Sequence, residues 1–166
     1  MRFGPRELVF EADSLDKSAT LPRISPDGRY LMFTLGKYGV FHIWHRDADL
    51  YILDLATGQV RNMKEINSPD VESYHSWSSN GRWVVFSSRR YDGNFTRPFI
   101  AHIDKNGQGT KPFELPCADP DYHRQFMKSY NIPEFMRGPV TINPQSFADV
   151  LKKDGEKVKY VQQLNK

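Results

Sequence analysis

Short β-prone runs of apolar residues alternate with polar, glycine-containing segments along most of the chain. The runs at 29–34 and 82–87 are almost continuously apolar, which is typical of inner strands that are covered on both faces. Each is followed by a further β-prone run, at 49–55 and 97–103, after a polar or glycine-containing break. The pattern predicts a mostly β chain in which antiparallel strands follow one another along the sequence.

An internal repeat organises these runs. Residues 22–35 read Pro-Arg-Ile-Ser-Pro-Asp-Gly-Arg-Tyr-Leu-Met-Phe-Thr-Leu, and residues 75–88 read His-Ser-Trp-Ser-Ser-Asn-Gly-Arg-Trp-Val-Val-Phe-Ser-Ser. Ser25 and Arg29 recur as Ser78 and Arg82. The repeat also shares two turn positions and one core aromatic: Asp27, Gly28 and Phe33 in the first copy, and Asn80, Gly81 and Phe86 in the second. Asp or Asn followed by Gly is typical of tight turns, because Gly adopts positive φ at no steric cost. We assign these positions a structural role in a stacked or radial repeat.

The motif Ser-Pro-Asp-Gly-Arg-aromatic-apolar-apolar-Phe begins at Ser25 and is followed at 50–58 by Leu-Tyr-Ile-Leu-Asp-Leu-Ala-Thr-Gly. This combination resembles the repeat of TolB-like, WD-related β-propellers of bacteria, over about residues 1–115. The resemblance implies two four-stranded antiparallel blades of a partial propeller, at about 20–66 and 72–115. It also implies that these are the carboxyl-terminal blades of a larger propeller protein of the periplasm or cell envelope.

We expect the two blades to occupy residues 1–116, with 7–12 as a strand of a preceding blade. Propellers close with roughly 4–8 blades. Two blades therefore predict either self-association or upstream blades that are missing from this chain.

Residues 117–166 are expected to form an extension with short helices. Aromatic residues recur at four-residue spacing from Tyr122, which predicts one helix with an aromatic stripe. Asn143-Pro144 is a cap followed by Pro at the first helical position, and it predicts a second helix. The charged stretch 156–166 is read as a weak helix or a frayed end.

Composition excludes several classes of protein. The formal net charge is only +3, without the clustered basic face of a nucleic-acid-binding protein. The sequence has no run of about 18 apolar residues, so it predicts no transmembrane helix. The first residues lack the apolar core of a signal peptide. The one cysteine, Cys117, excludes an internal disulfide. No nucleophile signature surrounds it, so we expect it to be a partly buried small residue.

No catalytic residue, metal site or cofactor is predicted. His42 and His45 fall in a stretch that reads as extended chain, where a spacing of three puts them on opposite faces and favours structural roles. His75 stands where the first copy has Pro22, and we expect it to hydrogen-bond across the two blades. The serines near His75 form no strained nucleophile elbow.

Two loops are the candidate binding elements. One, which follows the second inner strand, carries Arg89, Arg90, Tyr91 and Phe95, and the other carries Lys37 and Tyr38 at the matching place in the first copy. Arginine and aromatic side chains in loops are typical anchors for partners. If both loops lie on one face, they form a composite rim. The predicted function is a non-catalytic binding or scaffold module for a protein or glycan partner. The alternative is a propeller domain of a carbohydrate lyase or a serine peptidase-type enzyme.

Overall fold

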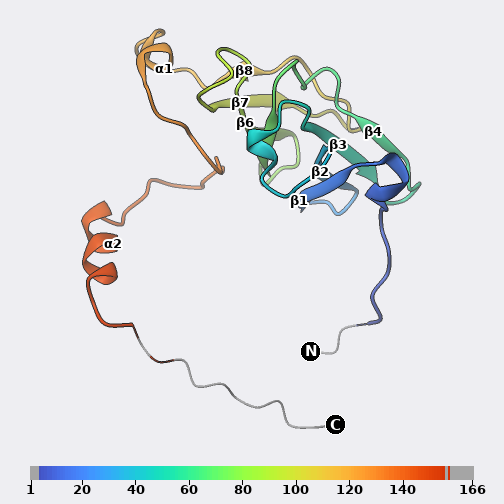
Figure 1. Cartoon of the computed structure of the whole chain (residues 1–166), viewed down its shortest axis with the longest axis horizontal. Coiled ribbons are helices and arrows are strands. Elements are labelled where there is room, and N and C mark those ends of the chain that lie inside the picture. The colour runs from blue at the N-terminus through green and yellow to red at the C-terminus, as the bar shows by residue number, and fades with distance from the viewer. Residues whose placement is uncertain (1–3, 156, 158–166) are drawn as a thin grey trace. The chain divides into compact units, whose positions relative to one another are not determined.

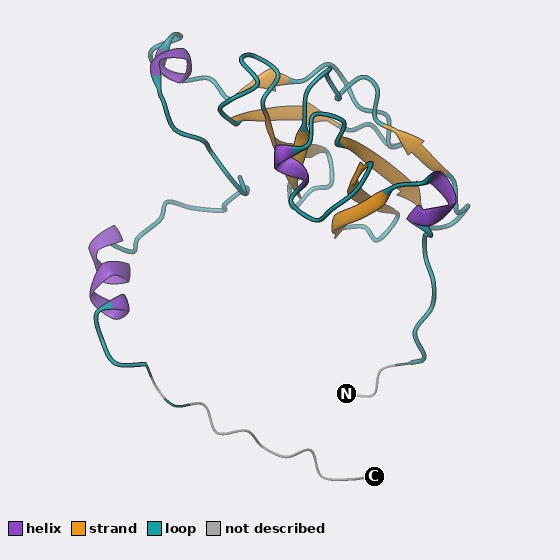
Figure 2. Cartoon of the chain, viewed as in Figure 1, coloured by secondary structure: helices purple, strands orange, loops and turns teal. Residues whose placement is uncertain are grey.

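A computed structural model describes residues 4–155 and 157 of the chain. It contains two four-stranded antiparallel sheets whose strands lie side by side in chain order (Figures 1 and 2). The first sheet comprises β1 (Ser18–Ile24), β2 (Tyr30–Gly36), β3 (Asp49–Asp54) and β4 (Val60–Asn62). The second comprises β5 (Glu72–Trp77), β6 (Trp83–Ser88), β7 (Arg97–His102) and β8 (Phe113–Glu114). The mostly β, two-blade prediction is confirmed, and we call the sheets blade one and blade two.

The two repeated turns are built by the same set of hydrogen bonds. Ser25 Oγ donates to Asp27 Oδ1 over 2.6 Å, and Ser78 Oγ donates to Asn80 Oδ1 over 2.7 Å. In both turns the same oxygen accepts from the next arginine amide, at 3.1 and 3.0 Å. The glycine that follows has a φ of 72° in the first turn and 65° in the second. The same type of turn therefore leads into β2 and into β6.

One hydrophobic core lies between the blades. Phe86 and Phe99 of blade two are buried against blade one, with ring centroids 6.1 Å apart. The buried side chains of this core are Tyr30, Met32, Leu50, Ile52, Met63, Ile66, Val84, Phe86, Phe99, Ala101 and Ile103. Successive residues on a strand point to opposite faces, so Phe33 lies on the other face of blade one. There it forms a second cluster with Leu35 and Leu53.

The segment 7–12 forms no strand, contrary to the prediction. Phe10 instead packs on Phe33, with ring centroids 4.9 Å apart, and covers the second cluster. The segment thus lies over the face of blade one rather than along a sheet edge, where backbone pairing would be available. The 3-10 helix η1 (Ala12–Leu15) follows it.

The extension beyond blade two contains two short helices, α1 (Tyr122–Gln125) and α2 (Pro144–Leu151). Asn143 caps α2 by accepting from the Gln145 amide over 3.0 Å, as its sequence predicts. The chain divides into a compact unit that ends at Phe135 and a second that begins at Met136. The proposed weak helix at 156–166 falls outside the described residues, apart from 157.

The predicted aromatic helix is much shorter than the aromatic stripe. The rings of Tyr122, Phe126 and Tyr130 do contact one another in sequence, at 5.3 and 5.4 Å. However, the buried Arg97 guanidinium donates hydrogen bonds to the carbonyl oxygens of Phe126 and Lys128, over 3.0 and 2.9 Å. A continuing helix would need those carbonyls for its own hydrogen bonds, so the helix stops.

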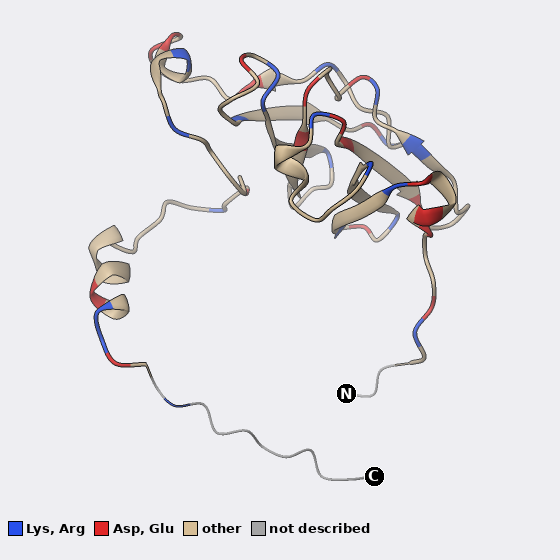
Figure 3. Cartoon of the chain, viewed as in Figure 1, with Lys and Arg blue, Asp and Glu red and all other residues tan. Residues whose placement is uncertain are grey.

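Basic and acidic residues are interspersed over the blades (Figure 3). Within the described residues, no helix has the length and apolar character that a membrane crossing requires.

Candidate functional site

Two loops leave the ends of the equivalent strands β2 and β6. We call them the rim loops: residues 37–48 and residues 89–96. Arg89 joins them, since its Nη1 donates to the Ile43 carbonyl over 3.3 Å and its guanidinium lies 5.2 Å from the Trp44 ring centroid. The same side chain also bonds the Gly93 carbonyl of its own loop. Arg89 therefore joins the two rim loops through Ile43 and Trp44, which lie outside the predicted Lys37–Tyr38 loop.

A hydrogen bond between its two ends closes the first rim loop, which also contains a short helix. The Lys37 amide donates to Asp47 Oδ2 over 2.6 Å. Between these residues lies the 3-10 helix η2 (His42–Trp44), so the expected extended chain is wrong. The two histidine rings of this loop are 5.7 Å apart rather than on opposite faces. His42 is buried against Thr20, and burial lowers its pKa.

Three aromatic side chains of the first rim loop point away from the core. Tyr38 is 70%, Phe41 68% and Trp44 69% exposed. Sequence reasoning found Tyr38 but missed the other two, which it assigned to extended chain. The signal that could have found them is an apolar stretch between Gly39 and a polar loop, with no equivalent in the second copy. Exposed aromatic side chains on one loop are candidates for contact with a partner.

Arg90 is held by the fold rather than presented at the rim. Its Nη2 lies 3.1 Å from Glu72 Oε1 and donates to the Ile66 carbonyl over 2.8 Å. Its guanidinium also lies 4.4 Å from the Phe99 ring centroid. Glu72 is fully buried, and burial raises the pKa of its carboxyl. Arg90 therefore neutralises a buried carboxylate between the blades.

The other two candidates of the second rim loop, Tyr91 and Phe95, differ in how far they are exposed. Phe95 is half-buried, with the Arg97 guanidinium 5.4 Å from its ring centroid. Tyr91 is 55% exposed, and its ring packs edge-on against Phe99 at 5.5 Å. Lys37, Tyr38 and Tyr91 therefore present exposed surface at the rim, whereas Arg90 and Phe95 support it.

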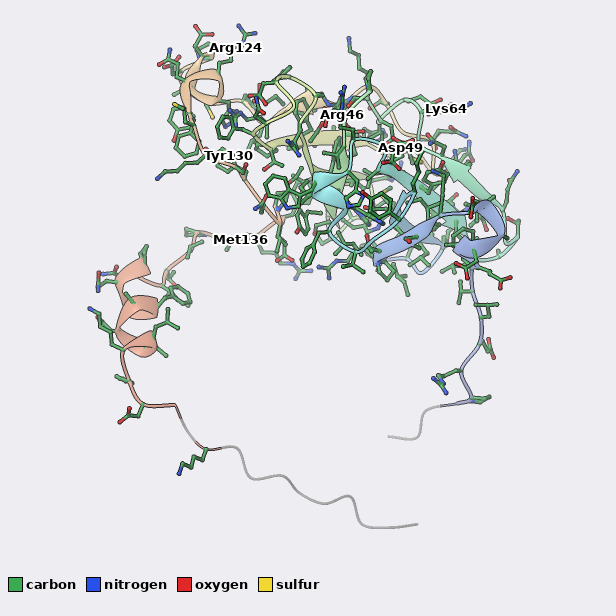
Figure 4. All side chains as sticks on the ribbon, in the orientation of Figure 1. Arg46, Asp49, Lys64, Arg124, Tyr130 and Met136 are labelled. Carbon is green, nitrogen blue, oxygen red and sulfur yellow. The ribbon has the colours of Figure 1, made fainter. Side chains whose placement is uncertain are left out.

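A pocket of about 470 Å³ opens beside the rim. Arg46, labelled in Figure 4, contributes one wall from the first rim loop, and its Nε lies 3.3 Å from Asp70 Oδ2. The pocket is lined by Arg46, Pro69, Asp70, Arg90, Tyr91, Asp92 and Gly93. Its walls carry both signs of charge, and both blades contribute to it. Among the described residues, no three His, Cys, Asp or Glu side chains are grouped so that they could hold a metal ion.

Neither the family models nor the curated proteins contain a match to this chain. Solved structures do match, over part of their length. The β-propeller domain of the Trilobed protease from Pyrococcus furiosus is 19% identical with a TM-score of 0.40, over 60% of this chain and 30% of that one. TolB from Acinetobacter baumannii is 17% identical with a TM-score of 0.39, over 60% and 21%. An acylaminoacyl peptidase from Pyrococcus horikoshii is 21% identical with a TM-score of 0.37, over 60% and 18%. The chain thus spans less than a third of each, and the set includes both TolB and peptidase proteins.

Proposed function

We propose that this chain is a propeller-type binding module that docks a protein partner on its rim loops, without catalysis of its own. The observation that carries the proposal is that the first rim loop exposes three aromatic side chains, Tyr38, Phe41 and Trp44. Tyr, Trp and Arg are the residues most enriched among those that dominate binding energy. The neighbouring Arg89 stacks on Trp44 and so holds one of these rings in place.

The surroundings of the aromatics favour a protein over a glycan. Protein interfaces combine a central aromatic group with a polar, charged rim. Arg46, with its side chain 79% exposed, and Asp92, with its side chain 39% exposed, provide such a border. The two-blade core beneath keeps the loops in a preset arrangement, which reduces the entropic cost of docking. The sequence resemblance to TolB-like propellers favours a periplasmic or cell-envelope setting for the module.

Site-specific photo-crosslinking tests the proposal. A photoreactive residue at position 41 is compared with one at position 147, because Phe147 is similarly exposed, at 59%, but belongs to α2 rather than to a rim loop. The proposal predicts a discrete protein adduct from position 41 and none of that mass from position 147. Equal labelling from both positions, or capture of polysaccharide alone, would contradict a protein-docking rim.

A further inference from the structure

The segment that follows β8 places the only cysteine of the sequence next to a histidine and a glutamate. Cys117 Sγ lies 3.2 Å from His123 Nε2, within hydrogen-bond distance for sulfur. On the other side of the ring, His123 Nδ1 lies 2.8 Å from Glu114 Oε1. Cys117 is exposed, whereas the histidine is 5% exposed. An accessible thiol therefore contacts a buried base that is held in turn by a carboxylate.

Local structure explains why these residues meet. Glu114 ends β8, and the chain then turns back through Asp119, whose Oδ1 accepts from the Asp121 amide over 2.9 Å. The turn leads into α1, whose single buried residue is His123. Tyr130 packs its ring edge-on against this histidine at 5.3 Å. The imidazole is thus fixed from several sides with its Nε2 facing the thiol.

The carboxylate completes an arrangement of nucleophile, base and orienting group. Glu114 Oε1 is buried and makes no hydrogen bond, so its approach to Nδ1 is a close charge contact rather than a linear bond. Such a contact stabilises positive charge on the ring. A histidine that gains positive charge on taking the thiol proton leaves a thiolate, which is the reactive form of cysteine.

We propose that Cys117 is an activated thiol that undergoes thiol–disulfide exchange with small disulfides, with His123 as its base and Glu114 as the positioning residue. Nε2 takes the proton from Sγ, and the thiolate attacks one sulfur of the disulfide. The new S–S bond forms as the old one breaks, and the departing thiolate receives the proton. The products are a mixed disulfide at Cys117 and one free thiol, so no further oxidant is needed.

The reaction is measured with dithiobis-nitrobenzoate, an anionic disulfide whose released thiolate absorbs light. At pH 6 we expect His123→Gln to react about tenfold or more slowly than the unsubstituted chain. The rate for His123→Gln should fall about tenfold per pH unit below neutrality, whereas the native chain should fall less steeply. Glu114→Gln should give an intermediate rate. His102→Gln, which changes a histidine on β7, is the matched control and should react like the native chain.

If His123→Gln does not fold, the native chain is compared with the same chain in urea at pH 6, and the folded form should react faster. Equal rates for native and His123→Gln chains, or a folded chain that reacts no faster than the unfolded one, would overturn the proposal.

Discussion

His75 of β5 donates its Nε2 hydrogen to the carbonyl oxygen of Met32 in β2, over 3.0 Å. The bond crosses from one blade to the other, as the sequence comparison with Pro22 predicts. The histidine is fully buried, its Nδ1 has no partner, and burial lowers its pKa to about 4. Burial therefore keeps this imidazole neutral at neutral pH, with its hydrogen on Nε2.

This pKa makes the stability of the two-blade unit depend on pH. The native state binds fewer protons at His75 than the unfolded state between pH 6.5 and about 4, so the free energy of unfolding falls as pH falls through that window. The loss at pH 4 amounts to roughly 3 kcal/mol. Urea unfolding from pH 7 to pH 4 should show this loss in the native chain and a much flatter curve in His75→Gln, whose amide can still donate to Met32. Parallel curves for the two chains would contradict the assignment.

The aromatic core between the blades should dominate stability. Phe86 is fully buried, and Phe86→Ala should lower the free energy of unfolding by about 3–5 kcal/mol through lost transfer energy and a cavity. Phe33→Ala, in the second cluster, should behave alike. Phe113 is 48% exposed, so Phe113→Ala serves as the control and should cost under about 1 kcal/mol. Urea melts measure all three, and a small loss for both buried sites would show that they are not core.

The pair of Arg90 and Glu72 should behave as a coupled structural unit. Arg90→Ala leaves a fully buried carboxylate without its cation and should cost about 3–5 kcal/mol. Glu72→Gln together with Arg90→Ala removes the buried charge and should recover part of that loss. A double variant that is simply the sum of its two single variants in urea unfolding would show that the two side chains are not coupled.

The repeated turns could be predicted from sequence because their chemistry is local. Ser25 and Asp27 act within a few residues of Gly28, so their pattern is enough to place the strand that follows. Arg90 could not be assigned in this way, since its partner Glu72 lies on the neighbouring strand. An arginine in a loop looks the same in sequence whether it faces solvent or a buried carboxylate.

The same reasoning explains the two features that sequence analysis missed. Cys117 meets His123 only because of the turn at Asp119, and neither residue carries a recognisable signature of its own. Trp44 is exposed because it ends a short helix. The apolar residues around that helix predict extended chain instead. Three-dimensional placement, rather than residue type, distinguishes these side chains from core residues.

The affinity of the crosslinked partner for rim variants tests the central claim most directly. Trp44 is 69% exposed, so Trp44→Ser should leave the melting temperature nearly unchanged while it removes a central contact. Calorimetric titration with the purified partner should show a dissociation constant raised about 30-fold, equivalent to about 2 kcal/mol. Phe147→Ser, in α2 rather than in a rim loop, should change it by less than about twofold. An unchanged affinity for Trp44→Ser, or an equal loss for both variants, would contradict docking at the rim loops.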